Sequence, residues 1–461
     1  MGNVMRATLS LSSAPNSIGF LGGLFLTFIW TLILASCSPM PIYPPVSQMP
    51  KLDRQKFPEI DTAIESFIAQ RQMPGAVFWL ERQGKSGDES YQKAYGKFSY
   101  EADAASITLN TIFDAASLTK VIATAPAVML LIEQGKVTLD APLIQFFPEC
   151  GGGGKEAITI RHLLTHTSGL PAGIPATLAD GSVWQGQAAA LKLACSQIVT
   201  HAPGTLFRYS DVNFILLGQL VQRVSGQPLN EFVEQKIYNP LGMRHTGYLP
   251  LKKFAVSAIA PTQKRMAVGA EKVIHSDLLQ DEILQGIVHD PTARRISGVA
   301  GHAGLFTTVF DLARFARMMV NEGELDGVRV LSRESVRQMS TVQSPTAVAS
   351  TVEWKRSAGW DIDSPYARPR GALFPVGRLN HPGSYGHTGF TGCVLWIDPL
   401  SKTFYVLLSN RVYPNDKGNI LNLYGTLGTL AAQAVAGFDF MNVTGASAAK
   451  LPTIINEKTS Y

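Results

Sequence analysis

The sequence predicts an α/β fold of the α+β kind, in which the two ends of the folded region build one antiparallel sheet flanked by helices. Two strand-like runs lie near the start, at 75–82 and 90–100, and two more lie near the end, at 392–398 and 402–409. Between them the apolar spacing is mainly helical. Because strands must pair, we expect the two hairpins to meet in one sheet, with a helical lobe inserted between them.

Residues 1–37 have the composition of a targeting segment. A lead that contains Arg6 and no acidic residue precedes the apolar run 18–34, and small residues follow, as in a secretory signal. Leu34-Ala35-Ser36-Cys37 is similar to a bacterial lipobox, which predicts lipidation at Cys37. An uncleaved membrane anchor is the alternative, because the apolar run is nearly long enough to span a bilayer. Either reading predicts export to the cell envelope, and the lipoprotein reading predicts an anchor on the periplasmic face.

The rest of the chain divides into a tether, one domain and a tail. Proline-rich residues 38–60 are expected to be an extended tether, residues 61–440 a single folded domain, and residues 441–461 a loose tail. A net charge of +5 without clusters of lysine or arginine gives no reason to expect a nucleic-acid partner. Besides Cys37 there are three cysteines, Cys150, Cys195 and Cys393, so at least one lacks an intramolecular partner and no disulfide framework is predicted.

The elements follow in order along the domain. An amphipathic helix at 61–70 precedes the first hairpin, whose strands are joined by the turn at 83–88, and a helix at 421–435 follows the second. The helix predicted at 117–134 is apolar over most of its circumference, so it should be central, with a kink at Pro126. Further helices are expected at 160–165, 212–224, 229–237, 311–321 and 332–339.

Ser117-Leu118-Thr119-Lys120 opens the central helix. Residues three apart on a helix share a face, and a buried, partly deprotonated amine could take the proton of Ser117 as it attacks a carbonyl. The same spacing occurs at Ser90 to Lys93, where a strand would turn the two side chains to opposite faces, and at Ser447 to Lys450 in the tail. The setting therefore favours Ser117 and Lys120, although a helix cap followed by a solvated lysine also fits.

Two later motifs suit the same chemistry. Tyr209 lies just ahead of the apolar helix 212–224 and could shuttle a proton if it lay beside Lys120. Taken alone, this segment favours a helix cap at Ser210 or Asp211, with Tyr209 packed beneath the helix. His387-Thr388-Gly389 precedes the second hairpin, so it can lie on a sheet edge where a substrate backbone could pair. His245-Thr246-Gly247 has the same letters but no clear strand after it.

With these three motifs in this order, the chain resembles the serine hydrolases related to class C β-lactamases and low-molecular-mass penicillin-binding proteins, whose pattern is S-x-x-K, Y-x-N, K-T-G. Residues 160–170 and 301–306 also look like this family. The resemblance implies a β-lactamase/transpeptidase-like fold, with Ser117 as nucleophile, Lys120 as its base and Tyr209 as proton shuttle.

The resemblance also assigns the remaining positions of the site. It implies an oxyanion hole from the backbone amides of Ser117 and Phe390, and it groups His387 with the catalytic residues. Substrate contacts are implied at four further residues: Asp211, Thr388, Gly389 and Asn415. Two positions depart from the family, since Asp211 replaces an asparagine and His387 replaces a lysine, and both changes weaken a site for a substrate carboxylate.

Other candidate groups carry less weight. His162 and His166 have a spacing that suits a metal but lack the glutamate of H-E-x-x-H, so core or capping roles are expected. His289, Asp290 and His302 flank a glycine-containing segment and could contact substrate or stabilise a loop. No metal or cofactor is predicted.

The predicted function is an exported serine hydrolase that acts through an acyl-enzyme on peptidoglycan-derived peptides or muropeptides. The same machinery in this family serves other substrates, so a promiscuous esterase and a weak β-lactamase stay open. A non-catalytic penicillin-binding or cell-wall-binding lipoprotein is the alternative from another class.

Overall fold

The computed structural model describes residues 52–84, 88–264, 283–349, 355–362, 367–371 and 383–438. All of them belong to one compact unit. The predicted signal segment with Cys37, most of the tether, the tail and the serine-lysine pair at Ser447 lie outside the described residues. Among the described helices, none combines the length and the apolar character needed to cross a membrane.

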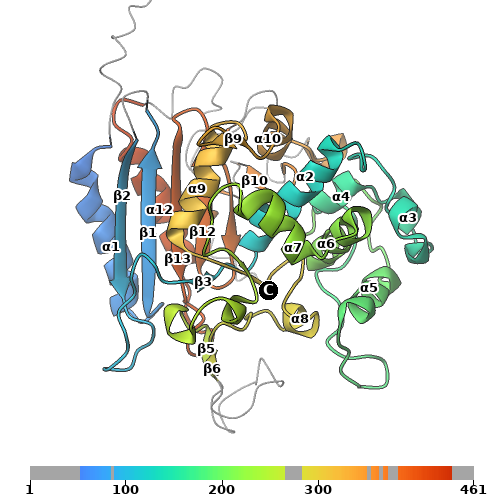
Figure 1. Ribbon diagram of the computed structural model, residues 1–461, viewed down its shortest axis with the longest axis horizontal. Coiled ribbons are helices and arrows are strands. Elements are labelled where there is room, and N and C mark those ends of the chain that lie inside the picture. The colour runs from blue at the N-terminus through green and yellow to red at the C-terminus, as the bar shows by residue number, and fades with distance from the viewer. Residues whose placement is uncertain are drawn as a thin grey trace, which may run out of the picture. The chain divides into compact units, whose positions relative to one another are not determined.

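One six-stranded antiparallel sheet joins the two ends of the domain (Figure 1). Its order is β10 (Asp361–Ile362), β11 (Tyr385–Gly389), β12 (Cys393–Asp398), β13 (Thr403–Ser409), β1 (Gly75–Arg82) and β2 (Glu89–Gly96). The two predicted hairpins meet where β1 pairs with β13, with Ala76 opposite Ser409. The predicted sheet is therefore confirmed, with β10 and β11 added at one edge.

Alternate residues of the central strands belong to different cores, as the period of a strand requires. On β1, Val77 and Trp79 join the large core shared with the helical lobe, whereas Phe78 and Leu80 join a second core beneath α1 (Phe57–Ala69) and α12 (Leu421–Gln433). Helix α9 (Val309–Val320) packs on β1, β12 and β13 (Figure 1). The sheet is thus covered by helices on both faces.

The folded domain begins earlier than residue 61. Helix α1 begins at Phe57, because Pro58 suits the first turn of a helix, and Leu52 pairs with Val435 in an isolated bridge. Asp53 caps the short helical turn Arg54–Lys56. Residues 52–60 therefore belong to the domain and not to a tether.

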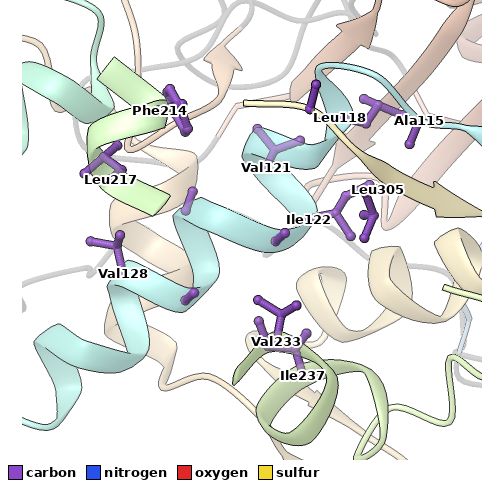
Figure 2. Packing of buried hydrophobic residues seen from close by; sticks show 14 of the residues in the cluster. Ala115, Leu118, Val121, Ile122, Val128, Phe214, Leu217, Val233, Ile237 and Leu305 are labelled. Atoms are coloured by element: carbon purple, nitrogen blue, oxygen red, sulfur yellow. The ribbon is translucent and has the colours of Figure 1, made fainter. Parts of the chain in front are cut away.

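The helical lobe is built around the chain that follows Ser117. A π-helical turn, Lys120–Thr124, leads into α2 (Ala125–Glu133), and Pro126 lies in the first turn of α2. Val121 and Ile122 from this segment pack with side chains of α6 (Asp211–Ser225) and α7 (Leu229–Val233), as Figure 2 shows. Pro126 cannot donate to the carbonyl of Ile122, which instead lies 3.5 Å from Tyr238 Oη.

The remaining elements are further α-helices and three small sheets. The other helices are α3 (Leu143–Phe146), α4 (Ile160–Leu164), α5 (Gln187–Ser196), α8 (Pro291–Arg295), α10 (Arg333–Ser340) and α11 (Thr346–Ala349). Three small sheets pair β3 (Phe113–Asp114) and β4 (Gly247–Tyr248) with β7 (Leu305–Thr307), β5 (Gln263–Lys264) with β6 (Ile283–Leu284), and β8 (Glu324–Leu325) with β9 (Val328–Arg329).

The cysteines pair in a way that the odd count did not predict. Cys150 and Cys195 form a disulfide that ties the turn after α3 to α5. Cys393 is free and buried on β12, where burial raises the pKa of its thiol to about 12. The prediction that at least one of these three cysteines lacks a partner is confirmed. The prediction that no structural disulfide forms is wrong.

Candidate active site

A tight turn presents Ser117 at the head of the central helix. Strand β3 pairs with β7, and Ala116 then takes a φ of 45°, an uncommon value for a residue with a side chain. The buried Asp114 carboxylate holds this turn by accepting hydrogen bonds from the backbone N–H of Ala116 at 2.8 Å and of His289 at 2.7 Å. Burial raises the pKa of Asp114 to about 6. Ser117 itself is half-buried.

Lys120 is fully buried one turn further on, and each of its three N–H donors has an acceptor nearby. Its Nζ lies 3.1 Å from Ser117 Oγ and 3.0 Å from the carbonyl of His302, and it forms an ion pair with Asp211 Oδ1 at 2.7 Å. Burial alone would lower the pKa of this lysine, but the charges and hydrogen bonds of Asp211 and Tyr209 outweigh it and raise the pKa. The expected partly deprotonated amine is therefore wrong for the resting site, which holds an ammonium.

Tyr209 lies over this ammonium, with its ring centroid 5.0 Å from Lys120 Nζ. His166 supports the tyrosine from beneath, at a ring separation of 4.5 Å, and its Nδ1 accepts the backbone N–H of Ser210 at 3.1 Å. Burial, followed by nearby cations, holds the pKa of His166 well below its usual value, so the ring is a neutral acceptor.

The two histidines of the 160–166 segment have different tasks. His162 forms a capping box with Thr159 at the start of α4, as expected of a capping histidine. His166 has a φ of 55° and leaves the helix to reach the site, which its sequence spacing does not indicate. Its position next to Tyr209 depends on a turn that only the folded chain defines.

His387 lies on β11 with its ring centroid 6.0 Å from that of Tyr209. The imidazole is buried, and its Nδ1 donates to the carbonyl of Thr388 at 2.7 Å, so Nε2 is left as an acceptor. Burial, with the charges of Arg356 and Lys120, lowers the pKa of His387 well below its usual value. The His387 imidazole therefore stays neutral to lower pH than a free imidazole does.

The end of β11 packs against the turn that presents Ser117. A Cβ on Gly389 would lie 2.5 Å from the carbonyl oxygen of Ala115, so only glycine allows this approach. Thr391 Oγ1 donates to the carbonyl of Asp114 at 2.6 Å. These contacts bring the backbone of Phe390, between them, beside the turn of Ser117, where the implied oxyanion donors would be.

Within the part of the chain that the structure describes, the edge of the sheet is open beside the end of β11. Strand β10 pairs only with Tyr385 and Gly386, so His387, Thr388 and Gly389 have β12 as their only strand partner in the described part of the chain. Thr388 is half-buried. The predicted edge position of the third motif is confirmed.

The other candidates fall in different places. Asn415 follows the cis Tyr413–Pro414 bond in a loop, and within the described residues no hydrogen bond or ion pair joins it to Ser117, Lys120 or Asp211. The alternative motif at His245 precedes the short strand β4, outside the six-stranded sheet, which corrects the expectation that no strand follows.

His302 and Asp290 do reach the site. His302 supplies its carbonyl to Lys120, while its Nε2 lies 3.0 Å from Asp290 Oδ1. Asp290 also caps α8 through the backbone N–H of Ala293, and the charge of His302, acting against burial, lowers the pKa of Asp290. The segment around residue 302 therefore supports the lysine.

Known proteins resemble this chain in sequence and in fold. A protein of Escherichia coli K12, provisionally named a D-alanyl-D-alanine carboxypeptidase, is 34% identical over 316 residues, which cover 66% of this chain and 70% of the relative. Two solved structures have the same fold. EstCE1, described as a hydrolase with promiscuous acyltransferase activity, has a TM-score of 0.63 at 20% identity and covers 82% of this chain and 99% of its own. A class C β-lactamase has a TM-score of 0.61 at 19% identity, and the match covers 84% of this chain and 98% of the β-lactamase.

A serine at a tight turn, a buried lysine in contact with it and a glycine-bearing sheet edge lie together, and acyl transfer is the chemistry that such an arrangement can support. The model of the family described as Beta-lactamase matches residues 60–429, which include every described part of this site. The chain therefore belongs to the beta-lactamase family.

Proposed function

We propose that this serine hydrolase forms an acyl-enzyme on Ser117 and acts on peptidoglycan-derived peptides or muropeptides, as a carboxypeptidase or amidase. One observation carries the proposal: Ser117 Oγ, partly open to solvent, lies 3.1 Å from the Nζ of a fully buried lysine. The provisional carboxypeptidase name of the relative from Escherichia coli supports the substrate class.

The chemistry assigns a role to each group around the nucleophile. Ser117 Oγ attacks the scissile carbonyl and its proton passes to Lys120, once that lysine is an amine, and then to the leaving amine by way of Tyr209. The backbone amides of Ser117 and Phe390 stabilise the oxyanion, a contribution of roughly 3–4 kcal/mol per donor in serine hydrolases. Water then cleaves the ester. The open edge of β11 offers hydrogen bonds to an extended peptide.

Ester hydrolysis is the second candidate, and His387 favours it. The family's lysine would give a cation beside the substrate, whereas His387 is a buried neutral imidazole. A site with less positive charge should accept uncharged acyl groups and react weakly with β-lactams, whose carboxylate needs a cation.

The proposed location is the periplasmic face of a membrane, with the lipid carried by Cys37. The disulfide between Cys150 and Cys195 supports export, since such bonds persist in oxidising compartments. Expressed in a Gram-negative host, wild type should incorporate a palmitate analogue and Cys37→Ala should not. Unlabelled wild type would favour the uncleaved anchor.

Turnover of a muropeptide that ends in D-Ala-D-Ala, compared with a neutral aryl ester, tests the function. We expect release of D-alanine by wild type and by Ser90→Ala, and none by Ser117→Ala. Ser90 is a matched control because it has the same spacing to a lysine but lies exposed on β2. Ester turnover without D-alanine release would favour the esterase, and binding of penicillin without turnover would favour a cell-wall-binding protein.

A further inference from the structure

Hydrogen bonds anchor the backbone of Asp211 at the first turn of α6. Its backbone N–H donates to the carbonyl of Ala172 at 2.7 Å, and the residue before it, Ser210, donates its hydroxyl to the carbonyl of Pro171 at 2.5 Å. The backbone N–H of Ser210 is bound by His166. The backbone of Asp211 is therefore fixed at a place from which its carboxylate reaches the lysine.

The lysine between Ser117 and Asp211 is in direct contact with both. Lys120 Nζ is 3.1 Å from Ser117 Oγ on one side and 2.7 Å from Asp211 Oδ1 on the other. This is the order of groups in which a base touches the nucleophile and is itself oriented by a third residue. If the ammonium loses a proton, the two remaining N–H groups can stay with Asp211 and the His302 carbonyl, which leaves the lone pair directed at Ser117.

We propose that Asp211 is a positioning residue which completes a Ser117–Lys120–Asp211 relay by orienting the lysine and stabilising the ammonium that forms during attack. This inference rests on the proposed role of Ser117. In the active form Lys120 is an amine, having released one proton to water. Ser117 Oγ bonds to the carbonyl carbon, its O–H bond breaks, and the proton forms the fourth bond of Lys120 Nζ. The ammonium then passes that proton to the leaving group by way of Tyr209.

The carboxylate has two opposing effects on the rate. It stabilises the ammonium that forms in the transition state, which speeds the reaction of the amine form. It also stabilises the resting ammonium, so less of the enzyme is in the amine form at neutral pH. The asparagine of the family's Y-x-N pattern is uncharged and would have neither effect at full strength.

Several other ionisable side chains among the described residues face Lys120. Tyr209 lies over it from the α6 side, Asp290 and His302 lie at the start of α8 and in the segment before β7, and His387 faces it from β11. His166 faces Lys120 from the end of α4. The charge of Arg356 helps to lower the pKa of His166 and of His387. Asp290 is the matched control for Asp211. One carboxylate oxygen of each residue and a ring nitrogen of His302 lie within 4.8 Å of one another, but Asp290 forms its ion pair with His302 and not with Lys120.

The test is the rate of covalent labelling of Ser117 by a fluorophosphonate, from about pH 6 to 11, around the reference lysine pKa. In wild type the rate should rise as Lys120 loses its proton. Asp211→Asn should move the midpoint to lower pH and reduce the high-pH plateau about 10- to 100-fold, the loss expected from one charge-assisted hydrogen bond. Asp211→Glu should restore a high midpoint, and Asp290→Asn should shift it less.

The outcomes separate the relay from the proposed function. Labelling that is absent in wild type, or that persists in Ser117→Ala, would refute the function and the relay together. Labelling that needs Ser117, with one midpoint shared by wild type and Asp211→Asn, would refute the relay alone. An equal shift from Asp290→Asn would also refute it, since any nearby negative charge would then suffice. Circular dichroism at both ends of the pH range checks that each variant is folded.

Discussion

Lys120 keeps its charge at a fully buried position because its partners replace water. An isolated buried ammonium would lose its proton, whereas Asp211 supplies an opposite charge and the His302 carbonyl and Ser117 hydroxyl supply acceptors. The resting lysine therefore donates to the nucleophile before it can act as a base. A consequence is that acylation should be faster in alkaline solution.

Asp114 should make stability depend on pH in a defined window. Its folded pKa of about 6 lies above the reference value of 3.8, so between these values the folded state binds more protons than the unfolded state. The free energy of unfolding should therefore fall as pH rises from about 4 to 6, by about 3 kcal/mol from this group. Urea unfolding of wild type and Asp114→Asn measures it. Burial also raises the pKa of Asp398 to about 6, but Asp398 is present in both proteins and so does not contribute to the difference between them. Identical slopes would contradict the assignment.

His387 should not respond to pH in the neutral range. Because its pKa is lowered, KM for an anionic and for a neutral ester should run parallel between about pH 6 and 8, around the reference pKa. His387→Lys should lower KM for the anionic ester by about tenfold, as one charge-assisted hydrogen bond would. A rise in KM for the anionic ester alone in wild type would show that the imidazole carries charge.

At the scale of elements, the site depends on the contact between β11 and the turn after β3. These segments are distant in sequence, and two contacts join them: Gly389 against Ala115 and Thr391 against Asp114. The hydrophobic pattern predicted the hairpin and its edge position. It could not predict this contact, which depends on how two elements from opposite ends of the domain come together.

Gly389→Ala tests that contact. The added Cβ would lie 2.5 Å from the carbonyl of Ala115, so the strand must move and the Phe390 amide with it. We expect a loss in kcat of about 10²-fold or more, as for removal of one oxyanion donor. Gly247→Ala on β4 is the matched control, since a Cβ there meets no atom within 4 Å. Unchanged kcat in Gly389→Ala would mean that Phe390 is not a donor.

The helices show the same division between local and distant information. Amphipathic patterns predicted α1, α6 and α9 to within a few residues. The sequence did not predict helices α5 and α8. The side chains of α5 are mostly small, because it is rich in alanine, and α8 has only five residues, so neither helix has a strong apolar stripe. His166 was missed as a site residue because a left-handed turn, and not helical spacing, brings it to Tyr209.

At the scale of the whole molecule, strands from both ends of the domain share one sheet, while the disulfide closes a loop within the helical lobe. Cys150 and Cys195 are 45 residues apart, so the bond should restrict the unfolded chain. Replacing both by alanine should lower the free energy of unfolding by about 2–4 kcal/mol. Thermal unfolding with and without reductant measures it. An unfolding temperature that does not respond to reductant would contradict a stabilising role.

The central claim is that Ser117 is the nucleophile that carries the acyl group, and peptide mapping after brief exposure to a fluorophosphonate, which needs no cation in the site, tests it most directly. Mass spectrometry should find the adduct on the peptide that contains Ser117 in wild type and in Ser90→Ala, and on no peptide of Ser117→Ala. Serine to alanine near the start of a helix typically costs about 1 kcal/mol, so the variant should stay folded. An adduct on another residue, or an adduct that persists in Ser117→Ala, would contradict the account.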